Sequence, residues 1–150
     1  MKVYKFGGAS VKDAESIKNV VRVLKHEGFE NTLIIISAMG KMTNAFEKVI
    51  HAYFNKSEDL RAQIDVVRNF HTELVEKLFE EKQPILFEIE LLFGQLSGFL
   101  AKNKSTDYNF IYDQIVGYGE LLSTKIISSY LNIVGISTTW IDVRDFIKTD

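Results

Sequence analysis

The run Leu-Ile-Ile-Ile at residues 33–36 constrains the fold of this chain more than any other feature. Four consecutive bulky apolar residues are typical of a strand that is covered on both faces, the usual state of a strand in a parallel sheet. A second apolar stretch, residues 3–6, alternates with lysines and ends at Gly7-Gly8. This alternation, which stops at two glycines, predicts another short strand.

A helix is expected between these two strands. Ser10 is a suitable N-cap, and Asp13 lies three residues later, as in a capping box. Apolar residues then recur at helical spacing over residues 17–24, and Gly28 fits the C′ position. The first 36 residues therefore predict a βαβ unit, whose crossover should be right-handed.

The rest of the chain is predicted to be mainly helical. Helices are expected over residues 46–54, 60–78, 85–100 and 111–130. Pro84, the single proline, fits the first turn of the third of these helices. Residues 136–142 are rich in β-branched side chains and predict a third strand.

Composition narrows the class of protein. The length of 150 residues suits one domain, and a net charge of −2 argues against a broad nucleic-acid surface. The absence of cysteine excludes disulfides, thiolate metal sites and thiol catalysis. We expect a cytoplasmic protein without membrane contact, because no signal peptide opens the chain and no apolar stretch looks long enough to cross a bilayer. His26, His51 and His71 lie far apart and are expected on helix surfaces, so no metal site is predicted.

The glycine loop after the first strand is the first candidate for chemistry. Gly7 and Gly8 allow backbone N–H groups to face an anion, and the start of a helix adds partial positive charge. Lys5, near the end of the strand, could contact a phosphate. The alternative is a tight turn between a strand and a helix, with a surface lysine.

A loop of small residues follows the second strand in the same way. Ligands of open α/β sheets bind at the carboxyl ends of strands, so two such loops at one edge support each other. Ser37 and Thr43 could supply hydroxyl groups, and Asn44 could cap the next helix. The alternative is a long capped loop without a ligand.

The third candidate is the segment Gly-Tyr-Gly-Glu at residues 117–120. Two glycines within a helical pattern lower its stability, but they make sense if a neighbour must approach the backbone closely. Glu120 could then point into a partly enclosed site and pair with a cation such as a substrate amine. The alternative is a solvated glutamate on an irregular helix.

Together, and in this order, these motifs resemble those of the aspartate kinases in the amino-acid kinase family. Residues 5–11 resemble the opening K-F-G-G-T-S-V, residues 37–44 the loop S-A-M-[GS]-x-x-T-[ND], residues 119–124 the box that begins G-E-[LR]-[LM]-S, and residues 142–145 and 149–150 the segment after the next strand. Each motif alone is modest, but three in order at suitable spacing are quite specific.

The resemblance implies an α/β fold, a three-layer α/β/α sandwich with a mainly parallel sheet. Residues 1–150 would form an N-terminal portion of that kinase domain. The implied activity is ATP-dependent phosphorylation of the side-chain carboxylate of L-aspartate, the first step toward lysine, threonine and methionine. Mg²⁺ would be held mainly by the ATP phosphates, and the full-length protein would be a homo-oligomer.

The resemblance also implies roles for individual residues. Lys5 matches the catalytic lysine that contacts the ATP phosphates. The other implied ATP-binding residues are Phe6, Gly7, Gly8 and Ser10. The implied substrate-binding residues are Ser37, Thr43 and Glu120, with Glu120 paired to the aspartate ammonium. No residue is implied as a metal ligand.

Two departures from the family pattern lead to alternatives. Ala9 stands where threonine is commoner, and the family's later G-G-S-D region, the contacts to the nucleotide base and the ACT regulatory domains are missing. We therefore expect the chain alone to be weakly active or inactive. Relatives of this fold phosphorylate glutamate, acetylglutamate, carbamate or nucleotides instead. A third hypothesis is a non-catalytic binding or assembly fragment with exposed apolar surface.

Overall fold

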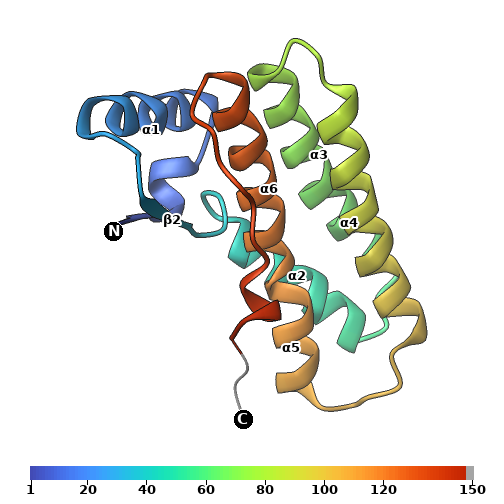
Figure 1. Cartoon of the computed structure of the whole chain (residues 1–150). Coiled ribbons are helices and arrows are strands. Elements are labelled where there is room, and N and C mark those ends of the chain that lie inside the picture. Colours follow the sequence, from blue (N-terminus) through green and yellow to red (C-terminus); the bar gives the residue numbers. More distant parts are fainter. Residues whose placement is uncertain (148–150) are drawn as a thin grey trace.

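Two short strands form a parallel pair at one end of the molecule. The computed structural model describes residues 1–147. Strand β1 (Lys2–Phe6) pairs with β2 (Thr32–Ile36) in the register Lys2 to Thr32 through Phe6 to Ile36. A short 3₁₀ turn, η1 (Gly8–Val11), and helix α1 (Ala14–Glu27) connect them (Figure 1). This arrangement confirms the predicted βαβ unit.

The capping residues of α1 differ in part from those expected. The Asp13 carboxylate accepts a hydrogen bond from the Ser16 backbone N–H at 2.8 Å, so Asp13 is the N-cap. Ser10 lies within the separate 3₁₀ turn, where its N–H donates to the Gly7 carbonyl at 2.8 Å, and its prediction as the N-cap was wrong. Gly28 ends the helix with a φ of +80°, as predicted.

The two faces of the sheet differ in exposure. Tyr4, Phe6 and Ile34 pack against the hydrophobic core, and Ile36 is buried within it. On the opposite face Leu33 and Ile35 remain 45% and 44% exposed. The parallel α/β arrangement is confirmed. The expectation that residues 33–36 are buried on both faces was wrong, because no element among residues 1–147 covers this second face.

The remainder of the described chain is helical. Its elements are α2 (Met42–Phe54), α3 (Leu60–Leu78), α4 (Gln83–Lys102), α5 (Tyr108–Val116), α6 (Tyr118–Ile133) and the short turn η2 (Val143–Asp145). Pro84 occupies the first turn of α4, as predicted. The single helix expected over residues 111–130 is instead two helices, α5 and α6, that meet at Gly117.

Helix α6 lies at the centre of the molecule, between the sheet and the pair α3 and α4 (Figure 1). Its side chains Leu122, Ile126 and Ile127 are fully buried. They belong to one continuous apolar cluster that extends from α1 and β2 to α4. The residues at the start of α6 are thereby fixed against the rest of the fold.

Residues 136–142 do not form a strand, so that prediction was wrong. The segment lies along α6 instead. The hydroxyl groups of Ser128 and Thr138 are 2.9 Å apart, and Trp140 Nε1 donates to Thr124 Oγ1 at 2.9 Å. The hydrogen-bond partners of this segment are thus polar side chains of α6, whereas a strand would pair with the backbone of a neighbouring strand.

His71 on α3 is buried, which corrects the expectation of three surface histidines. Its Nδ1–H donates to the Val67 carbonyl at 2.7 Å, so Nε2 carries the lone pair. Nε2 is itself buried and has no hydrogen-bond partner among the described residues. Burial lowers the pKa of His71 to about 4, so the ring is neutral in the folded protein at pH 7.

Helix α4 (Gln83–Lys102) corrects the expectation that no apolar stretch is long enough to cross a bilayer. By length and composition alone, this 20-residue helix is apolar enough to cross a membrane, the one such helix among residues 1–147. Core helices of soluble proteins meet the same criterion, and the inner side of α4 does lie in the core.

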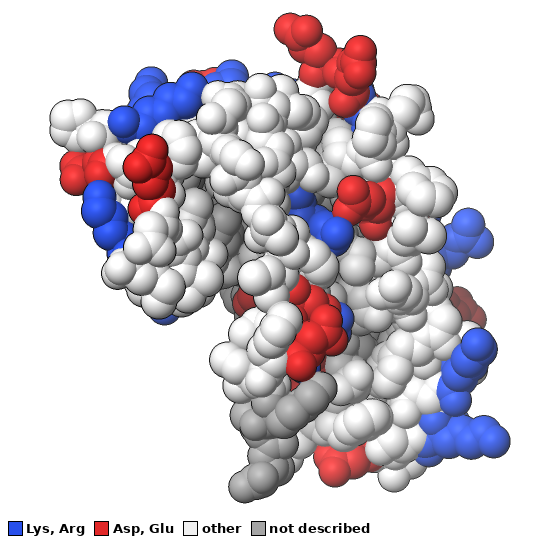
Figure 2. Space-filling model, in the orientation of Figure 1, with Lys and Arg blue, Asp and Glu red and all other residues white. Residues whose placement is uncertain are grey.

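On the face that Figure 2 shows, basic and acidic side chains are interspersed rather than gathered into one basic patch.

Candidate functional site

The first two candidate loops lie against each other. The Ser37 N–H donates to the Phe6 carbonyl at 3.1 Å, and the Gly40 N–H donates to the Gly8 carbonyl at 3.0 Å. A Cβ added to Gly8 would lie only 2.7 Å from the Ala38 carbonyl oxygen. Gly8 is therefore required by the close approach of the second loop.

Gly7 is in a different position from Gly8. A Cβ on Gly7 would meet nothing within 4 Å, so open space borders the backbone there. Lys5 is exposed on β1 and makes no ion pair within residues 1–147. An exposed cation beside an open glycine backbone suits an anionic ligand.

The partial positive charge of a helix N-terminus was expected at the glycine loop, but α1 begins only at Ala14. The turn that begins at Gly8 is a four-residue 3₁₀ turn, and the N-terminus of α1 lies further along the chain. Asp13 already accepts a hydrogen bond at that N-terminus. Any anion at the glycines is therefore held by local N–H groups and Lys5 rather than by the dipole of α1.

The second loop has a tight turn at Gly40, whose φ is +52°. Helix α2 begins at Met42 with Lys41 at its N-cap, so Asn44 lies within the first turn and does not cap the helix. Ser37 and Thr43 are half-buried. Their hydroxyl groups make no hydrogen bond within the described part of the chain, which leaves them available to a ligand.

The third motif packs onto the second. A Cβ on Gly119 would lie 3.0 Å from the Ala38 Cβ, tighter than ordinary van der Waals contact. One turn further along α6, the buried Ser123 hydroxyl donates to the Ser37 carbonyl at 2.8 Å. The close approach predicted for the glycines is confirmed at Gly119.

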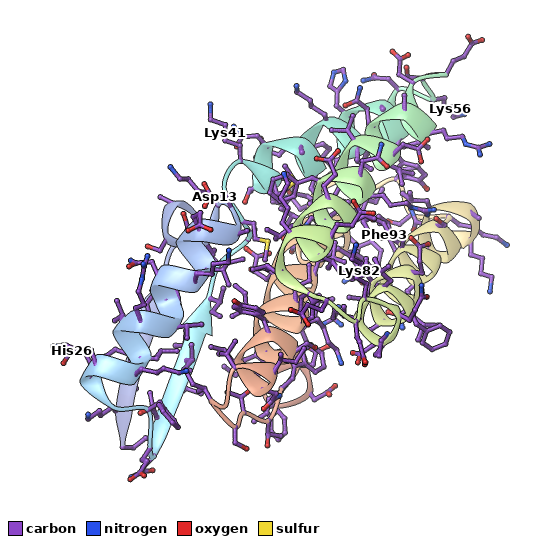
Figure 3. The ribbon with its side chains drawn as sticks, turned by 90° about the horizontal axis from the view of Figure 1, so that it is seen from above. Asp13, His26, Lys41, Lys56, Lys82 and Phe93 are labelled. Atoms are coloured by element: carbon purple, nitrogen blue, oxygen red, sulfur yellow. The ribbon has the colours of Figure 1, made fainter. Side chains whose placement is uncertain are left out.

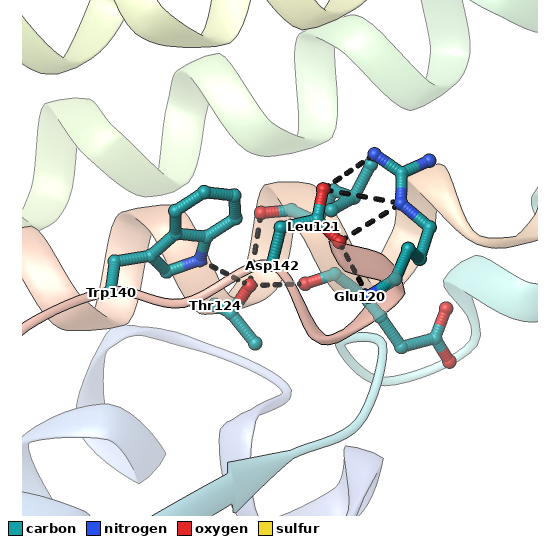
Figure 4. Close-up of polar contacts among 6 residues, drawn as sticks. Glu120, Leu121, Thr124, Trp140 and Asp142 are labelled. Carbon is teal, nitrogen blue, oxygen red and sulfur yellow. Dashed lines mark hydrogen bonds and ion pairs between the residues drawn. The ribbon is translucent and has the colours of Figure 1, made fainter. Parts of the chain in front are cut away.

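Glu120 is exposed, which corrects the expectation of a partly enclosed carboxylate. Its neighbours Gly119 and Leu121 are buried, so the helix turns Glu120 outward. Figure 4 shows its carboxylate extending away from the contact between Thr124 and Trp140. Glu120 lies in the first turn of α6.

Arg144 is a further charged residue at this site. Its guanidinium donates to both carboxylate oxygens of Asp142, at 2.9 Å through Nε and 2.6 Å through Nη2, and this pair raises the pKa of Arg144. Burial raises the pKa of Tyr118, and the nearby Arg144 charge partly offsets that effect. The interaction with Tyr118 therefore places Arg144, and with it Asp142, near the start of α6.

The sequence marked residues 142–145 only through a resemblance and gave Arg144 no role. The available signal was an aspartate two residues before an arginine, a spacing that holds the guanidinium in place. The matching segment at residues 149–150 lies outside the described residues.

A groove of about 650 Å³ lies between β2 and the segment at residues 136–141, and Thr124 and Trp140 line it. Lys5, Gly8, Ser37 and Glu120 do not line it. Within residues 1–147 no group of three His, Asp or Glu side chains could hold a metal ion. The site is thus built from loop backbone, hydroxyl groups and separated charges.

Comparison with known proteins agrees with this arrangement. The profile of the Amino acid kinase family matches residues 1–150. Aspartokinase 1 of Arabidopsis thaliana chloroplasts is 32% identical over 154 residues, covering 99% of this chain and 26% of the relative. The bifunctional aspartokinase/homoserine dehydrogenase 2 of Escherichia coli is 24% identical over 150 residues, covering 99% of this chain and 18% of the relative.

A solved structure extends the likeness to three dimensions. The crystal structure of E. coli aspartokinase III in complex with aspartate and ADP superposes with a TM-score of 0.82 at 26% identity. The match covers 96% of this chain and 31% of that one. The chain spans 26% and 28% of the length of the two Arabidopsis aspartokinases that it matches at 32% identity. With a family profile over all 150 residues and this structural agreement, the chain belongs to the amino acid kinase family.

Proposed function

We propose that this protein catalyses ATP-dependent phosphorylation of the side-chain carboxylate of L-aspartate, giving 4-phospho-L-aspartate. The observation that carries the proposal is the meeting of three motifs at Ala38, which contacts Gly8 on one side and Gly119 on the other. The aspartokinase relatives and the structure that holds aspartate and ADP support the choice of substrate.

Lys5 and the glycine loop form the phosphate side of the proposed site. Phosphoryl transfer depends on positioning and charge neutralisation. Lys5 makes no ion pair within residues 1–147 and lies beside open backbone at Gly7, so it is suited to both tasks. Phe6, Gly7, Gly8 and Ser10 belong to this loop. Mg²⁺ would be held mainly by the ATP phosphates.

The substrate side must bind one ammonium and two carboxylate groups. Glu120, exposed in the first turn of α6, is the anion suited to the ammonium. Arg144, which is paired with Asp142 and interacts with Tyr118 of the same helix, is a cation suited to a carboxylate. Ser37 and Thr43 offer hydroxyl donors at the loop between the two sides. The charges of the site thus complement L-aspartate.

The proposed chemical step is a direct transfer. An oxygen of the aspartate side-chain carboxylate attacks the γ-phosphorus of ATP, and the bond between that phosphorus and the β–γ bridging oxygen breaks. The products are the acyl phosphate and ADP. Lys5 would neutralise charge on the transferring phosphoryl group, and Glu120 would bind the ammonium group and so orient the substrate.

The test is a substrate panel on the longest natural form of the protein that contains this chain. Hydroxylamine traps acyl phosphates as hydroxamates, so ATP is supplied with aspartate, glutamate, acetylglutamate or carbamate in turn, and ADP release is followed in parallel. We expect a hydroxamate from aspartate. Faster turnover of another acceptor would assign a different reaction in this family, and no turnover together with no nucleotide binding would favour an assembly role. Residues 1–150 alone should be weakly active or inactive.

A further inference from the structure

Ser123 on α6 is one of two polar residues that are buried within residues 1–147, and the other is His71. A buried hydroxyl group without a hydrogen-bond partner destabilises a fold, so the partner it has indicates what the residue does. The Ser123 hydroxyl donates to the Ser37 carbonyl at 2.8 Å, across 86 positions of the sequence. Its side chain therefore joins α6 to the loop that follows β2.

The direction of this hydrogen bond differs from that of the next residue on the helix. A serine or threonine within a helix can donate to the carbonyl one turn earlier. Thr124 does this, because its Oγ1 donates to the Glu120 carbonyl at 2.7 Å. Ser123 donates instead to a segment outside its own helix. The hydroxyl of Ser123 thus holds the loop, whereas that of Thr124 binds within α6.

Two successive turns of α6 contact two successive residues of the loop. In the first turn a Cβ on Gly119 would lie only 3.0 Å from the Ala38 Cβ. In the second turn Ser123 binds Ser37. Seen from above in Figure 3, α6 lies beside β2, and the loop runs from the end of β2 to Lys41 before α2. The lack of a side chain at Gly119 lets α6 come close enough for Ser123 to reach the loop.

Ser37 is held through its backbone on both sides. Its N–H donates to the Phe6 carbonyl at the end of β1, at 3.1 Å, and its carbonyl accepts from Ser123. Because a peptide unit is planar, a fixed carbonyl fixes the orientation of the whole unit between Ser37 and Ala38. The Ser37 hydroxyl makes no hydrogen bond within residues 1–147. The backbone is thus fixed, while the hydroxyl is left for a ligand.

We propose that Ser123 is a positioning residue, which holds the Ser37 hydroxyl where it donates to the side-chain carboxylate of the acceptor. This role rests on the proposed function, in which Ser37 lies between the phosphate side and the substrate side of the site. Without the Ser123 hydroxyl, the Ser37 carbonyl loses its partner among the described residues, and the peptide unit after Ser37 turns toward another donor. A displacement of about 1 Å in a group that orients a reactant lowers a rate by about 10²-fold.

The first experiment compares Ser123→Ala with Ser128→Ala in the longest natural form of the protein that contains this chain. The Ser128 hydroxyl, on the same helix, is 2.9 Å from Thr138 Oγ1, so its variant also removes one hydrogen bond of α6 but leaves the loop unchanged. With ATP and aspartate, we expect Ser123→Ala to lower kcat at least about tenfold and Ser128→Ala to change it less than about twofold. The KM for ATP should stay nearly constant in both variants.

The second experiment separates positioning from a general effect on the fold. Ser37→Ala removes the hydroxyl but keeps the backbone carbonyl that Ser123 binds. If Ser123 acts through the Ser37 hydroxyl, Ser123→Ala should cause no further loss of kcat in a protein that already carries Ser37→Ala. Ser123→Cys keeps the size of the side chain and a weak donor, so its kcat should lie between those of the unmodified protein and Ser123→Ala. It replaces the alanine variant in the cycle if that variant does not fold.

The hydrogen bond itself has a readout that does not depend on activity. The dipeptide Ser-Ala occurs once within residues 1–150, so ¹³C-labelled serine and ¹⁵N-labelled alanine mark the peptide unit between Ser37 and Ala38. The NMR shifts of this carbonyl and amide should move in Ser123→Ala and stay unchanged in Ser128→Ala. Shifts that do not move in Ser123→Ala would show that the hydrogen bond is absent and would overturn the proposal.

The kinetic outcomes distinguish the role of Ser123 from the reaction. An unchanged kcat for Ser123→Ala, or losses that multiply in the double variant, would overturn the role of Ser123 and leave the proposed function in place. No turnover of aspartate by the unmodified protein would overturn the proposed function, and this role with it.

Discussion

Gly119 on α6 faces Ala38 in the loop after β2 so closely that a Cβ on the glycine would lie 3.0 Å from the Ala38 Cβ. Gly8 contacts the carbonyl of the same alanine from the other loop. Ala38 is buried at the point where three segments distant in sequence meet. The first two segments follow β1 and β2, and the third is the first turn of α6. The packing of these elements therefore determines the geometry of the candidate site.

Substitutions at the adjacent glycines should have unequal effects. In Gly8→Ala the new methyl group would meet the Ala38 carbonyl oxygen at 2.7 Å, so the backbone must shift, at a cost of about 1–3 kcal/mol in the free energy of unfolding. Gly7→Ala is the control, because its Cβ has open space and its φ of −74° suits any residue. Urea unfolding of both variants measures the difference. Equal stability would contradict the tight contact.

Stability should fall in mild acid because of His71. Its pKa is about 4 when folded and about 6.5 when unfolded, so between these values the unfolded state binds the extra proton. The free energy of unfolding is therefore not reduced by His71 above pH 6.5, and it decreases as the pH falls from 6.5 toward 4. Between pH 7 and 5 the loss should be about 2 kcal/mol.

His71→Leu should remove this part of the pH dependence, measured as the free energy of unfolding at each pH. His26→Leu, at an exposed position, serves as the control and should leave the dependence unchanged. If His71→Leu shows the same slope as the unmodified protein, the ring is not neutral in the folded state.

Lys5 should matter for catalysis and little for folding. In the complete protein we expect Lys5→Ala to lower kcat by about 10²-fold or more, because a charge aimed at the transferring phosphoryl group is lost. The unfolding midpoint should stay the same, since Lys5 is exposed and unpaired within residues 1–147. Lys48→Ala, also exposed, is the matched control. Unchanged turnover would remove Lys5 from the reaction.

Glu120 should affect the acceptor more than the nucleotide. Glu120→Gln keeps the size of the side chain but removes the charge that would bind an ammonium group, so the KM for aspartate should rise about tenfold or more while the KM for ATP stays nearly constant. Glu76→Gln, an exposed change on α3, is the control. A parallel rise in both KM values would point to a structural effect instead.

Local signals in the sequence predicted much of the fold. Gly7-Gly8 after an alternating stretch, Gly28 after a helical pattern and Pro84 at a helix start each act within a few residues, and each is confirmed. The meeting of the first two loops could also be anticipated, because parallel strands end at the same edge of a sheet.

Features that depend on distant neighbours escaped prediction. Residues 136–142 have strand-forming side chains, yet their partners are side chains of α6. His71 lies four residues after Val67 and three before Leu74, so helical spacing puts it on the apolar face of α3, and its polar ring hid this signal for burial. Glu120 turned out to be exposed, because the buried contact at that point is made by its neighbour Gly119.

One hydroxyl group joins the single tryptophan to the candidate site. Thr124 Oγ1 accepts from Trp140 Nε1 at 2.9 Å and donates to the Glu120 carbonyl at 2.7 Å. Indole emission is sensitive to the hydrogen bonding and charge around the ring, and Lys125 Nζ lies 4.0 Å from the ring centroid. The protein therefore contains its own optical reporter, one helical turn from Glu120, that needs neither label nor substitution.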